Sequence, residues 1–241
     1  MIIDCISDLH GHYPELEGGD LLIVGGDWTA SDTFEENGEF LIWAISRAQK
    51  QYKKVVLIAG NHDNLIYKAY KNGNETYQYL SLSYLCDSGT ELTYHNERFP
   101  EEDEGFLPSG KRTFKIWGSP WTKTFEGMNP HCKAFTVDTE AELEEKWKLI
   151  PDDVDILITH SPEFGSLDAI PNMYDGTLFH AGSKSLRDTY KRIKPKLHVF
   201  GHIHEGYGSA AADFDLNTIF VNASHVNEHY KPVNKPIRIV L

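Results

Sequence analysis

The sequence is poor in cysteine and has no pair of closely spaced cysteines. Only three occur in 241 residues, Cys5, Cys86 and Cys132, and no CxxC motif is present. Disulfide frameworks and zinc ribbons need more cysteines at closer spacing. The first residues also carry no basic segment before a strand-like run, so no secretory signal is expected. These absences predict a cytoplasmic protein whose cysteines are buried as small hydrophobic residues.

Basic residues and long hydrophobic runs are scarce as well. The chain has 23 Lys and Arg against 36 Asp and Glu, which gives a formal charge of −13. Proteins that hold extended nucleic acid neutralise phosphates with Lys and Arg, so this charge disfavours such a partner. No hydrophobic run approaches the roughly 18 residues that a membrane span requires, so no membrane partner is expected.

The overall composition is that of a globular protein. Hydrophobic residues make up 40% and charged residues 24%, which excludes collagen-like and low-complexity chains. No internal repeat or linker-like tract interrupts the chain, and we expect residues 1–241 to form a single domain. The acidic run at residues 101–104 lies between two prolines and is interpreted as a solvated loop.

Short apolar segments rich in β-branched residues recur along the chain, with helical patterns between several of them, and this is typical of an α/β fold. Strands are predicted at residues 2–7, 21–24, 55–59, 114–117, 155–159, 197–200, 218–222 and 237–241. One helix is predicted from the apolar stripe Phe40, Leu41, Ala44, Ile45 and Ala48.

Two further helices are predicted from their end signals. The helix at residues 139–149 begins with Thr139 and Glu142 at capping-box spacing. The helix at 183–193 ends before Pro195, because proline disfavours the α conformation in the residue that precedes it.

Residues able to bind metal follow five of the predicted strands. They are Asp8 and His10, Asp27, Asn61, His160, and His202 with His204. Ligands bind at the carboxyl ends of strands in α/β sheets, so we expect these side chains to converge. Carboxylate, amide and imidazole donors without thiolate suit Mn, Fe, Zn or Ni. The sequence therefore predicts a transition-metal centre.

Each motif alone has a plainer interpretation. A single Asp-x-His after a strand is more often a turn than a ligand pair, and Gly60-Asn61-His62-Asp63 could be a turn that caps a helix from Asn64 onward. Only the ordered set of five favours a metal centre. The other histidines are interpreted as surface or core residues; they are His12, His95, His131, His180, His198, His225 and His229.

The ordered motifs resemble those of the calcineurin-like metallophosphoesterase superfamily. They are Asp8-x-His10, Gly26-Asp27, Gly60-Asn61-His62, His160 and Gly201-His202-x-His204. Gly118-Ser119-Pro120-Trp121 and the stretch at 195–208 resemble the metallophosphoesterase-domain-containing branch, which is related to class III cyclic nucleotide phosphodiesterases. The resemblance implies a four-layer α/β (α+β) fold, in which two mixed β-sheets pack as a sandwich flanked by helices.

The resemblance also implies a dinuclear centre. One ion would be held by Asp8, His10, Asp27 and His204, and the other by Asp27, Asn61, His160 and His202, with Asp27 bridging. His62 would protonate the leaving group, and Asp63 is expected to orient it because the two are adjacent. The alternative for His62 is a further metal ligand or a helix-cap histidine.

We therefore expect a metal-dependent phosphodiesterase that acts on small or cyclic nucleotides by hydroxide attack at two divalent ions, with Mn²⁺ as the first choice. The alternatives are a phosphomonoesterase with the same centre and a non-catalytic metal-binding scaffold. Many protein phosphatases have Gly-Asp-x-x-Asp-Arg-Gly, whereas Asp27 here is followed by Trp28-Thr29-Ala30-Ser31, which disfavours phosphoprotein substrates. Tyr207 and Trp121 could stack on a base, with core packing as the alternative.

Overall fold

The structure is a computed structural model that describes residues 1–73, 82–95, 111–125, 127–172, 175–211 and 217–241. The acidic run expected to form a loop at 101–104 lies outside these residues. Within them, no helix is long and apolar enough to cross a membrane.

The first sheet contains the N-terminal strands and has the order β15-β1-β2-β3-β4. Strands β1 (Ile2–Ile6), β2 (Gly19–Val24), β3 (Tyr52–Leu57) and β4 (Ser83–Tyr84) run parallel to one another. Strand β15 (Ile237–Val240) pairs antiparallel with β1 and makes the sheet mixed.

The second sheet has the order β13-β14-β12-β9-β6-β5. Its four central strands are parallel: β14 (Ile219–Asn222), β12 (Leu197–Phe200), β9 (Ile156–Thr159) and β6 (Lys111–Ser119). The edge strands β13 (Gly208–Ala211) and β5 (Ser88–His95) run antiparallel to their neighbours. All eight strands predicted from the apolar runs are present.

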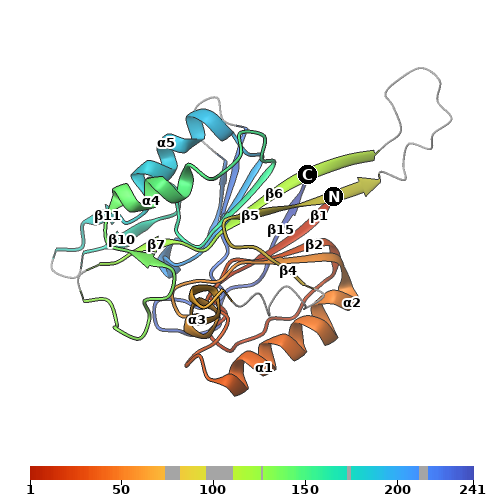
Figure 1. Ribbon diagram of the computed structural model, residues 1–241, viewed down its shortest axis with the longest axis horizontal. Helices are drawn as coiled ribbons and strands as arrows, with labels where there is room; N and C mark the ends of the chain where they lie inside the picture. The colour runs from red at the N-terminus through yellow and green to blue at the C-terminus, as the bar shows by residue number, and fades with distance from the viewer. Residues whose placement is uncertain (74–81, 96–110, 126, 173–174, 212–216) are drawn as a thin grey trace.

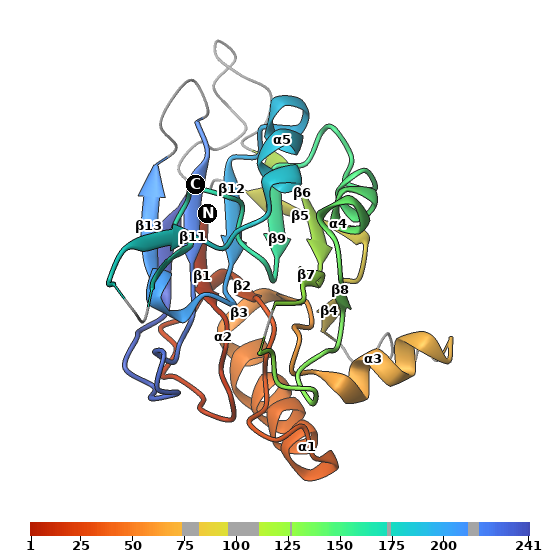
Figure 2. The same cartoon turned by 90° about the vertical axis from the view of Figure 1, so that its left-hand side faces the viewer.

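The two sheets pack face to face through alternating apolar side chains. Ile3, Cys5 and Ile23 of the first sheet belong to the same buried cluster as Ile158 and Val199 of the second. The intervening residues of these strands face the other way and pack in a second cluster that includes the helices. Figures 1 and 2 show the helices outside the strands, with α1 and α2 on one side and α4 and α5 on the other. The four-layer sandwich is therefore confirmed.

The helix predicted from the stripe at 40–48 begins as α1 (Phe34–Trp43), passes through a π-helical turn at Ala44–Ala48 and ends as α2 (Gln49–Gln51). Phe40, Ala44 and Ala48 are buried as expected. Ile45 is exposed, which corrects the predicted stripe. A π turn has more residues than an α turn and rotates the side chains that follow, so a stripe read at α spacing misplaces one of them.

The other two predicted helices are α4 (Glu140–Trp147) and α5 (Lys184–Ile193). The capping box is present: the Glu142 amide donates to Thr139 Oγ1 over 3.2 Å, and the Thr139 amide donates to Glu142 Oε2 over 2.9 Å. Helix α5 ends at Lys194, whose φ of 40° is left-handed, directly before Pro195. Proline therefore ends this helix as predicted.

Several short elements were not predicted. They are the edge strands β4, β5 and β13, a 3-10 turn (His204–Gly206), and the paired strands β7 (Thr122–Lys123) with β8 (Thr136–Val137) and β10 (Ala169–Pro171) with β11 (Leu178–His180). These strands are very short or lie at sheet edges with exposed side chains, so they lack a buried apolar run. Helix α3 (Asn64–Lys71) begins at the residue where the plainer interpretation of Gly60-Asn61-His62-Asp63 placed a helix start, and it packs Ile66 and Tyr67 against the core.

The cysteines follow the prediction only in part. Cys5 is buried between the sheets and Cys86 and Cys132 are half-buried; all three are free thiols. Burial of all three was therefore wrong, because Cys86 and Cys132 lie in loops near the surface rather than on inner strands.

Candidate metal centre

The loops that follow the strands of both sheets bring the predicted ligands together. The loops after β1 and β2 are joined by backbone hydrogen bonds from the Asp8 amide to the Gly26 carbonyl and from the His10 amide to the Asp27 carbonyl, both 3.0 Å long. Three groups of side chains have ligand atoms within 4.8 Å of one another. They are Asp8, His10 and His204; His10, Asp27 and His62; and Asp8, Asp27 and His160.

Asp27 lies at the middle of this cluster. Its buried Oδ2 is 3.3 Å from His160 Nε2, 3.9 Å from His62 Nε2 and 4.0 Å from His10 Nε2. Its Oδ1 accepts a 2.8 Å hydrogen bond from the His62 amide, which fixes the carboxylate plane. One carboxylate thus faces histidines from three separate loops.

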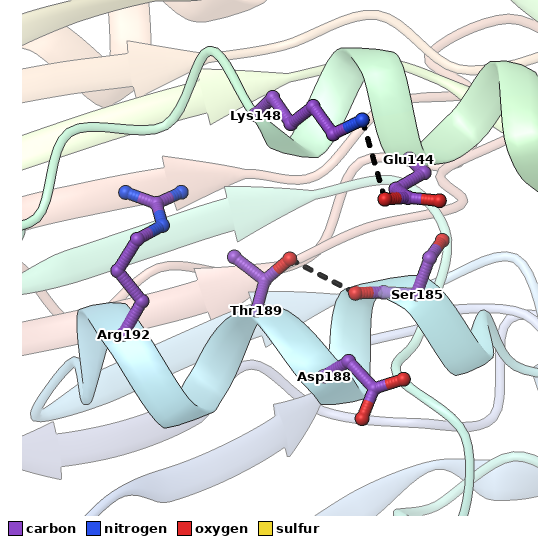
Figure 3. A pocket seen from close by; sticks show the side chains of 6 residues that line it. All are labelled: Glu144, Lys148, Ser185, Asp188, Thr189 and Arg192. Atoms are coloured by element: carbon purple, nitrogen blue, oxygen red, sulfur yellow. Dashed lines mark hydrogen bonds and ion pairs between the residues drawn. The ribbon is translucent and has the colours of Figure 1, made fainter.

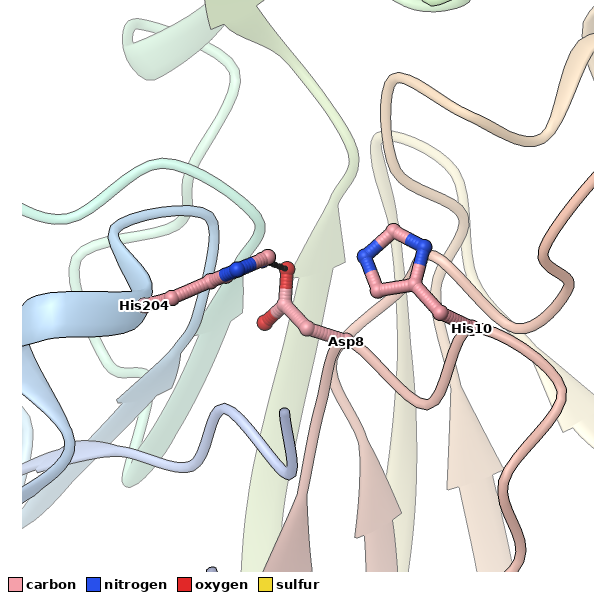
Figure 4. A group of neighbouring side chains, drawn as sticks. All are labelled: Asp8, His10 and His204. Carbon is pink, nitrogen blue, oxygen red and sulfur yellow. Dashed lines mark ion pairs between the residues drawn. The ribbon is translucent and has the colours of Figure 1, made fainter. Parts of the chain in front are cut away.

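Asp8 is held beside the C-terminal part of the chain. Oδ1 is 3.3 Å from His204 Nε2, and Figure 4 shows the carboxylate directed at the His204 ring with His10 on the other side. The His202 amide donates to both oxygens over 3.1 Å and Ser224 Oγ donates to Oδ2 over 2.9 Å. Burial alone would raise the pKa of Asp8, but the hydrogen bond from His204 and the charges of His204 and His160 outweigh burial and lower this pKa below its usual value. Asp8 is therefore ionised, the form that binds cations.

His160 contacts both Asn61 and Asp27. His160 Nδ1 donates to the Gly25 carbonyl over 2.9 Å, and Asn61 Nδ2 donates to the Cys132 carbonyl over 3.1 Å. His160 Nε2 therefore faces two acceptors, Asn61 Oδ1 at 3.0 Å and Asp27 Oδ2 at 3.3 Å. A proton on Nε2, or a metal ion in its place, would compensate the two oxygens that face it.

The pKa values of two histidines show where the cluster favours positive charge. Burial alone would lower the pKa of His160, but the charge of Asp27 and its hydrogen bond raise it to about 10. The pKa of His204 is raised as well: burial opposes the shift, and the hydrogen bond and charge of Asp8 outweigh it. Positive charge is favoured at both places, and divalent cations would supply it.

His10 provides a second test of whether a metal fits. Both of its ring nitrogens are buried without a hydrogen-bond partner among the described residues. Burial lowers the pKa of His10 to about 4, so the ring is neutral and can offer a lone pair. An unpaired buried polar group costs free energy, and coordination would remove that cost at one nitrogen. The donor set and the orphaned imidazole both fit a divalent transition metal.

His202 lies beside the three groups of ligand atoms but is not a member of them. Its ring centroid is 5.1 Å from that of His160, and burial lowers its pKa to about 3, so it is neutral. It belongs to none of the three compact groups found in the described part of the chain. Its amide hydrogen bonds to Asp8 nevertheless place it against the same cluster.

Four of these residues have left-handed backbone conformations. The φ angles are 50° for Asp8, 42° for His10, 53° for Asp27 and 67° for His202. Each costs about 1–3 kcal/mol for a residue with a side chain, and such strain concentrates at functional sites. The fold thus maintains this cluster against the local preference of its backbone.

Two glycines allow the loops to approach the ligands closely. A Cβ on Gly201 would lie 1.9 Å from Asp8 Oδ2, and one on Gly60 would lie 2.3 Å from Asp27 Oδ1. Any side chain at these positions would displace the carboxylates.

The expected role of Asp63 is wrong. Its buried carboxylate accepts from the amides of Gly60, Asp27 and Trp28 at 2.7, 2.9 and 3.1 Å. It therefore holds the two loops that carry Asp27 and Asn61 rather than the His62 ring. The adjacency of Asp63 and His62 was misleading, because the helix that starts at Asn64 turns the two side chains in different directions.

The side chain that contacts the His62 ring nitrogen Nδ1 is that of Cys132, for which the sequence predicted only a packing role. Cys132 Sγ lies 3.5 Å from His62 Nδ1, which leaves Nε2 to face Asp27. The His62 side chain is 17% exposed, so it can be reached from solvent. Because His62 also groups with His10 and Asp27, its geometry fits either a proton donor or a ligand.

The other aromatic and histidine candidates have structural contacts. Trp121 is buried and donates from Nε1 to Asp87 over 2.8 Å, so it packs in the core. The Tyr207 hydroxyl donates to the Lys235 carbonyl over 2.9 Å. His198 is buried between Thr159 and Tyr190, as expected for a core histidine.

A surface hollow of about 350 Å³ lies elsewhere, between α4 and α5 (Figure 3). Glu144, Lys148 and Arg192 are among its lining residues. Lys148 pairs with Glu144 and Arg192 pairs with Asp152, so these charges are already compensated. None of the candidate metal ligands is among the residues that line it.

A mixed β-sandwich with an Asp and His cluster at its strand ends defines the metallophosphoesterase class of fold. A sequence model of the calcineurin-like phosphoesterase family matches residues 1–206. The chain belongs to this family, and it is therefore a metal-dependent phosphoesterase, a hydrolase of phosphoester bonds.

The chain is also similar to named proteins over nearly its whole length. The human metallophosphoesterase domain-containing protein 1 is 36% identical over 98% of this chain and 70% of its own length. UPF0046 protein T07D4.2 of Caenorhabditis elegans is 31% identical over 97% of this chain and 58% of its own length. The crystal structure of TT1561 of Thermus thermophilus has a TM-score of 0.54 at 15% identity, covers 92% of this chain and 88% of that chain, and is similar in fold alone.

Proposed function

We propose that this protein hydrolyses phosphodiesters, with small or cyclic nucleotides as substrates, at a centre of two divalent ions, of which Mn²⁺ is the first choice. The ligands of one ion are Asp8, His10, Asp27 and His204, and those of the other are Asp27, Asn61, His160 and His202. The observation that carries this proposal is the position of the Asp27 carboxylate, which belongs to two of the groups and contacts His160 over 3.3 Å. Bound there, the ions would activate water and neutralise charge on the phosphate.

The residues of the chain itself supply orientation and a proton. The Gly25 and Asn227 carbonyls accept from Nδ1 of His160 and His204 over 2.9 and 3.1 Å, so both Nε2 atoms face the cluster. His62 Nε2 has no hydrogen bond to the described residues and is close enough to solvent to meet a leaving-group oxygen. His62 therefore donates a proton to the departing alkoxide.

A diester is favoured over a monoester by the residues after Asp27. The phosphatase arginine has no counterpart there: the motif spacing puts it at Ser31, which is exposed and whose amide donates to Glu36 Oε2 over 2.7 Å. A monoester dianion carries more charge than a diester and gains more from an arginine clamp. The formal charge of −13 also favours small substrates over long polyanions.

The substrate class is tested by comparing specificity constants. We expect 2',3'- or 3',5'-cyclic nucleotides and bis-p-nitrophenyl phosphate to be hydrolysed at higher kcat/KM than p-nitrophenyl phosphate and a phosphopeptide. If monoesters exceed every diester by tenfold or more, about 1.4 kcal/mol in transition-state binding, the enzyme is a phosphomonoesterase. If no ester is turned over by the metal-loaded protein, the scaffold alternative replaces both.

Replacing His62 by alanine tests the proton donor. His62→Ala should keep its metals, lose about 10²-fold or more on substrates with poor leaving groups and lose much less on p-nitrophenyl esters, whose leaving group needs little protonation. His12, an exposed histidine, gives the control substitution His12→Ala. Equal losses on both kinds of substrate would contradict proton donation, and a loss of metal would make His62 a ligand.

A further inference from the structure

Tyr230, which was not among the predicted site residues, packs its ring against histidines of the metal cluster. The ring centroid of Tyr230 is 4.8 Å from that of His10, 5.3 Å from that of His204 and 6.3 Å from that of His62. Tyr230 nevertheless remains 51% exposed. It therefore packs against the histidines with about half of its side chain open to solvent.

The backbone of Tyr230 is strained and firmly held. Its φ is 57°, which is uncommon for any residue with a side chain and costly for a bulky one. Asn227 Oδ1 accepts from the amides of His229 and Lys231 over 3.0 Å, and the Asn227 carbonyl accepts from the Tyr230 amide over 2.8 Å. A half-exposed ring gains less from burial than a core residue, so packing alone does not account for this conformation.

The same loop orients a candidate ligand. The Asn227 carbonyl also accepts from His204 Nδ1 over 3.1 Å. Asn227 therefore fixes the position of Tyr230 and that of the His204 ring together, and the tyrosine keeps a constant place relative to the cluster.

The Tyr230 hydroxyl is available to a ligand. No group in the described ranges makes a hydrogen bond to it. A phenol hydroxyl can donate a hydrogen bond to a phosphate oxygen. The atoms around it belong to a cluster that attracts phosphate once cations are bound. Tyr207 differs, since its hydroxyl is occupied by the Lys235 carbonyl.

We propose that Tyr230 is a substrate-contacting residue whose hydroxyl donates a hydrogen bond to a phosphate oxygen at the cluster, while its ring forms one wall for the leaving group. This assignment rests on the proposed function and adds a specificity-determining residue to it. A bulky leaving group packs against the ring, and a small one does not.

Two variants separate the hydroxyl from the ring. Tyr230→Phe removes only the hydroxyl, and Tyr230→Asn removes the ring while retaining a residue that tolerates positive φ. We expect both to weaken binding of inorganic phosphate to the Mn²⁺-loaded protein by about tenfold, measured by calorimetry, with metal content unchanged. Only Tyr230→Asn should also reduce the preference for aryl over methyl esters. Tyr70→Phe, at another tyrosine that is about half exposed, is the control and should match the parent protein.

Phosphate affinity within twofold of the parent in both variants would overturn the proposal. Loss of metal from both variants would also overturn it, because Tyr230 would then be a packing residue for His10 and His204. The readouts distinguish this inference from the proposed function. If the parent protein binds phosphate through Tyr230 but hydrolyses no ester, the contact stands and the proposed reaction fails. If it hydrolyses esters and Tyr230→Phe leaves both phosphate binding and KM unchanged, the reaction stands and the contact fails.

Discussion

Replacing Asp27 by asparagine should lower kcat/KM by about 10³-fold or more, about 4 kcal/mol in transition-state stabilisation. The buried carboxylate faces His10, His62 and His160, and it is the one side chain proposed to bind both ions. Asparagine can keep the 2.8 Å hydrogen bond from the His62 amide, so the loop should stay in place. It replaces the oxygen nearest the histidines with an amide nitrogen that has no lone pair to offer a metal.

The measurement pairs kinetics with elemental analysis of the purified variant. Asp152→Asn removes an exposed carboxylate that pairs with Arg192 and is the control for a lost charge, with an expected change near zero. Two tightly held ions per chain in Asp27→Asn would show that Asp27 does not bridge them.

A single added methyl group at Gly201 should have the second largest effect. In Gly201→Ala the new Cβ would lie 1.9 Å from Asp8 Oδ2 and 2.2 Å from Ser7 Oγ. Either the Asp8 carboxylate moves away from His204 or the strand end is displaced. We expect loss of metal binding together with a fall of about 1–3 kcal/mol in the free energy of unfolding.

Gly38 offers a matched control within the same chain. It lies inside α1, and no atom comes within 4 Å of a Cβ built there. Gly38→Ala should therefore raise the free energy of unfolding by about 0.5–1 kcal/mol through helix propensity and leave activity unchanged. The close approach described here is wrong if denaturant titration and metal analysis show Gly201→Ala to be as stable and as metal-rich as Gly38→Ala.

Central elements of the fold were predictable because they are buried on both faces. Strands such as β9 (Ile156–Thr159) and β12 (Leu197–Phe200) are fully buried and mostly apolar, and they are followed by a histidine or a glycine; a short run bounded in this way is typical of a buried parallel strand. Paired strands such as β10 and β11 have only three residues each and expose Leu178 and Phe179. Their strand conformation depends on pairing with each other, which a local pattern does not contain.

The ligand candidates were predictable because strand ends converge in sheets of this kind. The residues that orient them were not, since their contacts span the chain. Ser224 reaches Asp8 across 216 residues, and the Cys132 carbonyl reaches Asn61 across 71. Asp63 was singled out but given the wrong partner, because sequence adjacency does not show which way a side chain points at the start of a helix.

Tyr230 was also not predictable from its local sequence. Its positive φ is set by the hydrogen bonds of Asn227, and nothing in His229-Tyr230-Lys231 marks it as a turn residue. An asparagine three residues earlier was the only available signal, and asparagines are common in loops.

Metal depletion followed by reconstitution of the full chain tests most directly whether the protein acts through bound metal. The protein is stripped by a chelator, its metal content is verified as nil, and phosphodiester hydrolysis is measured before and after titration with Mn²⁺. We expect no turnover in the stripped protein and recovery that saturates at two ions per chain, as the proposed dinuclear centre predicts. Full turnover by the stripped protein would contradict the central claim that this cluster of carboxylates and histidines acts through bound metal.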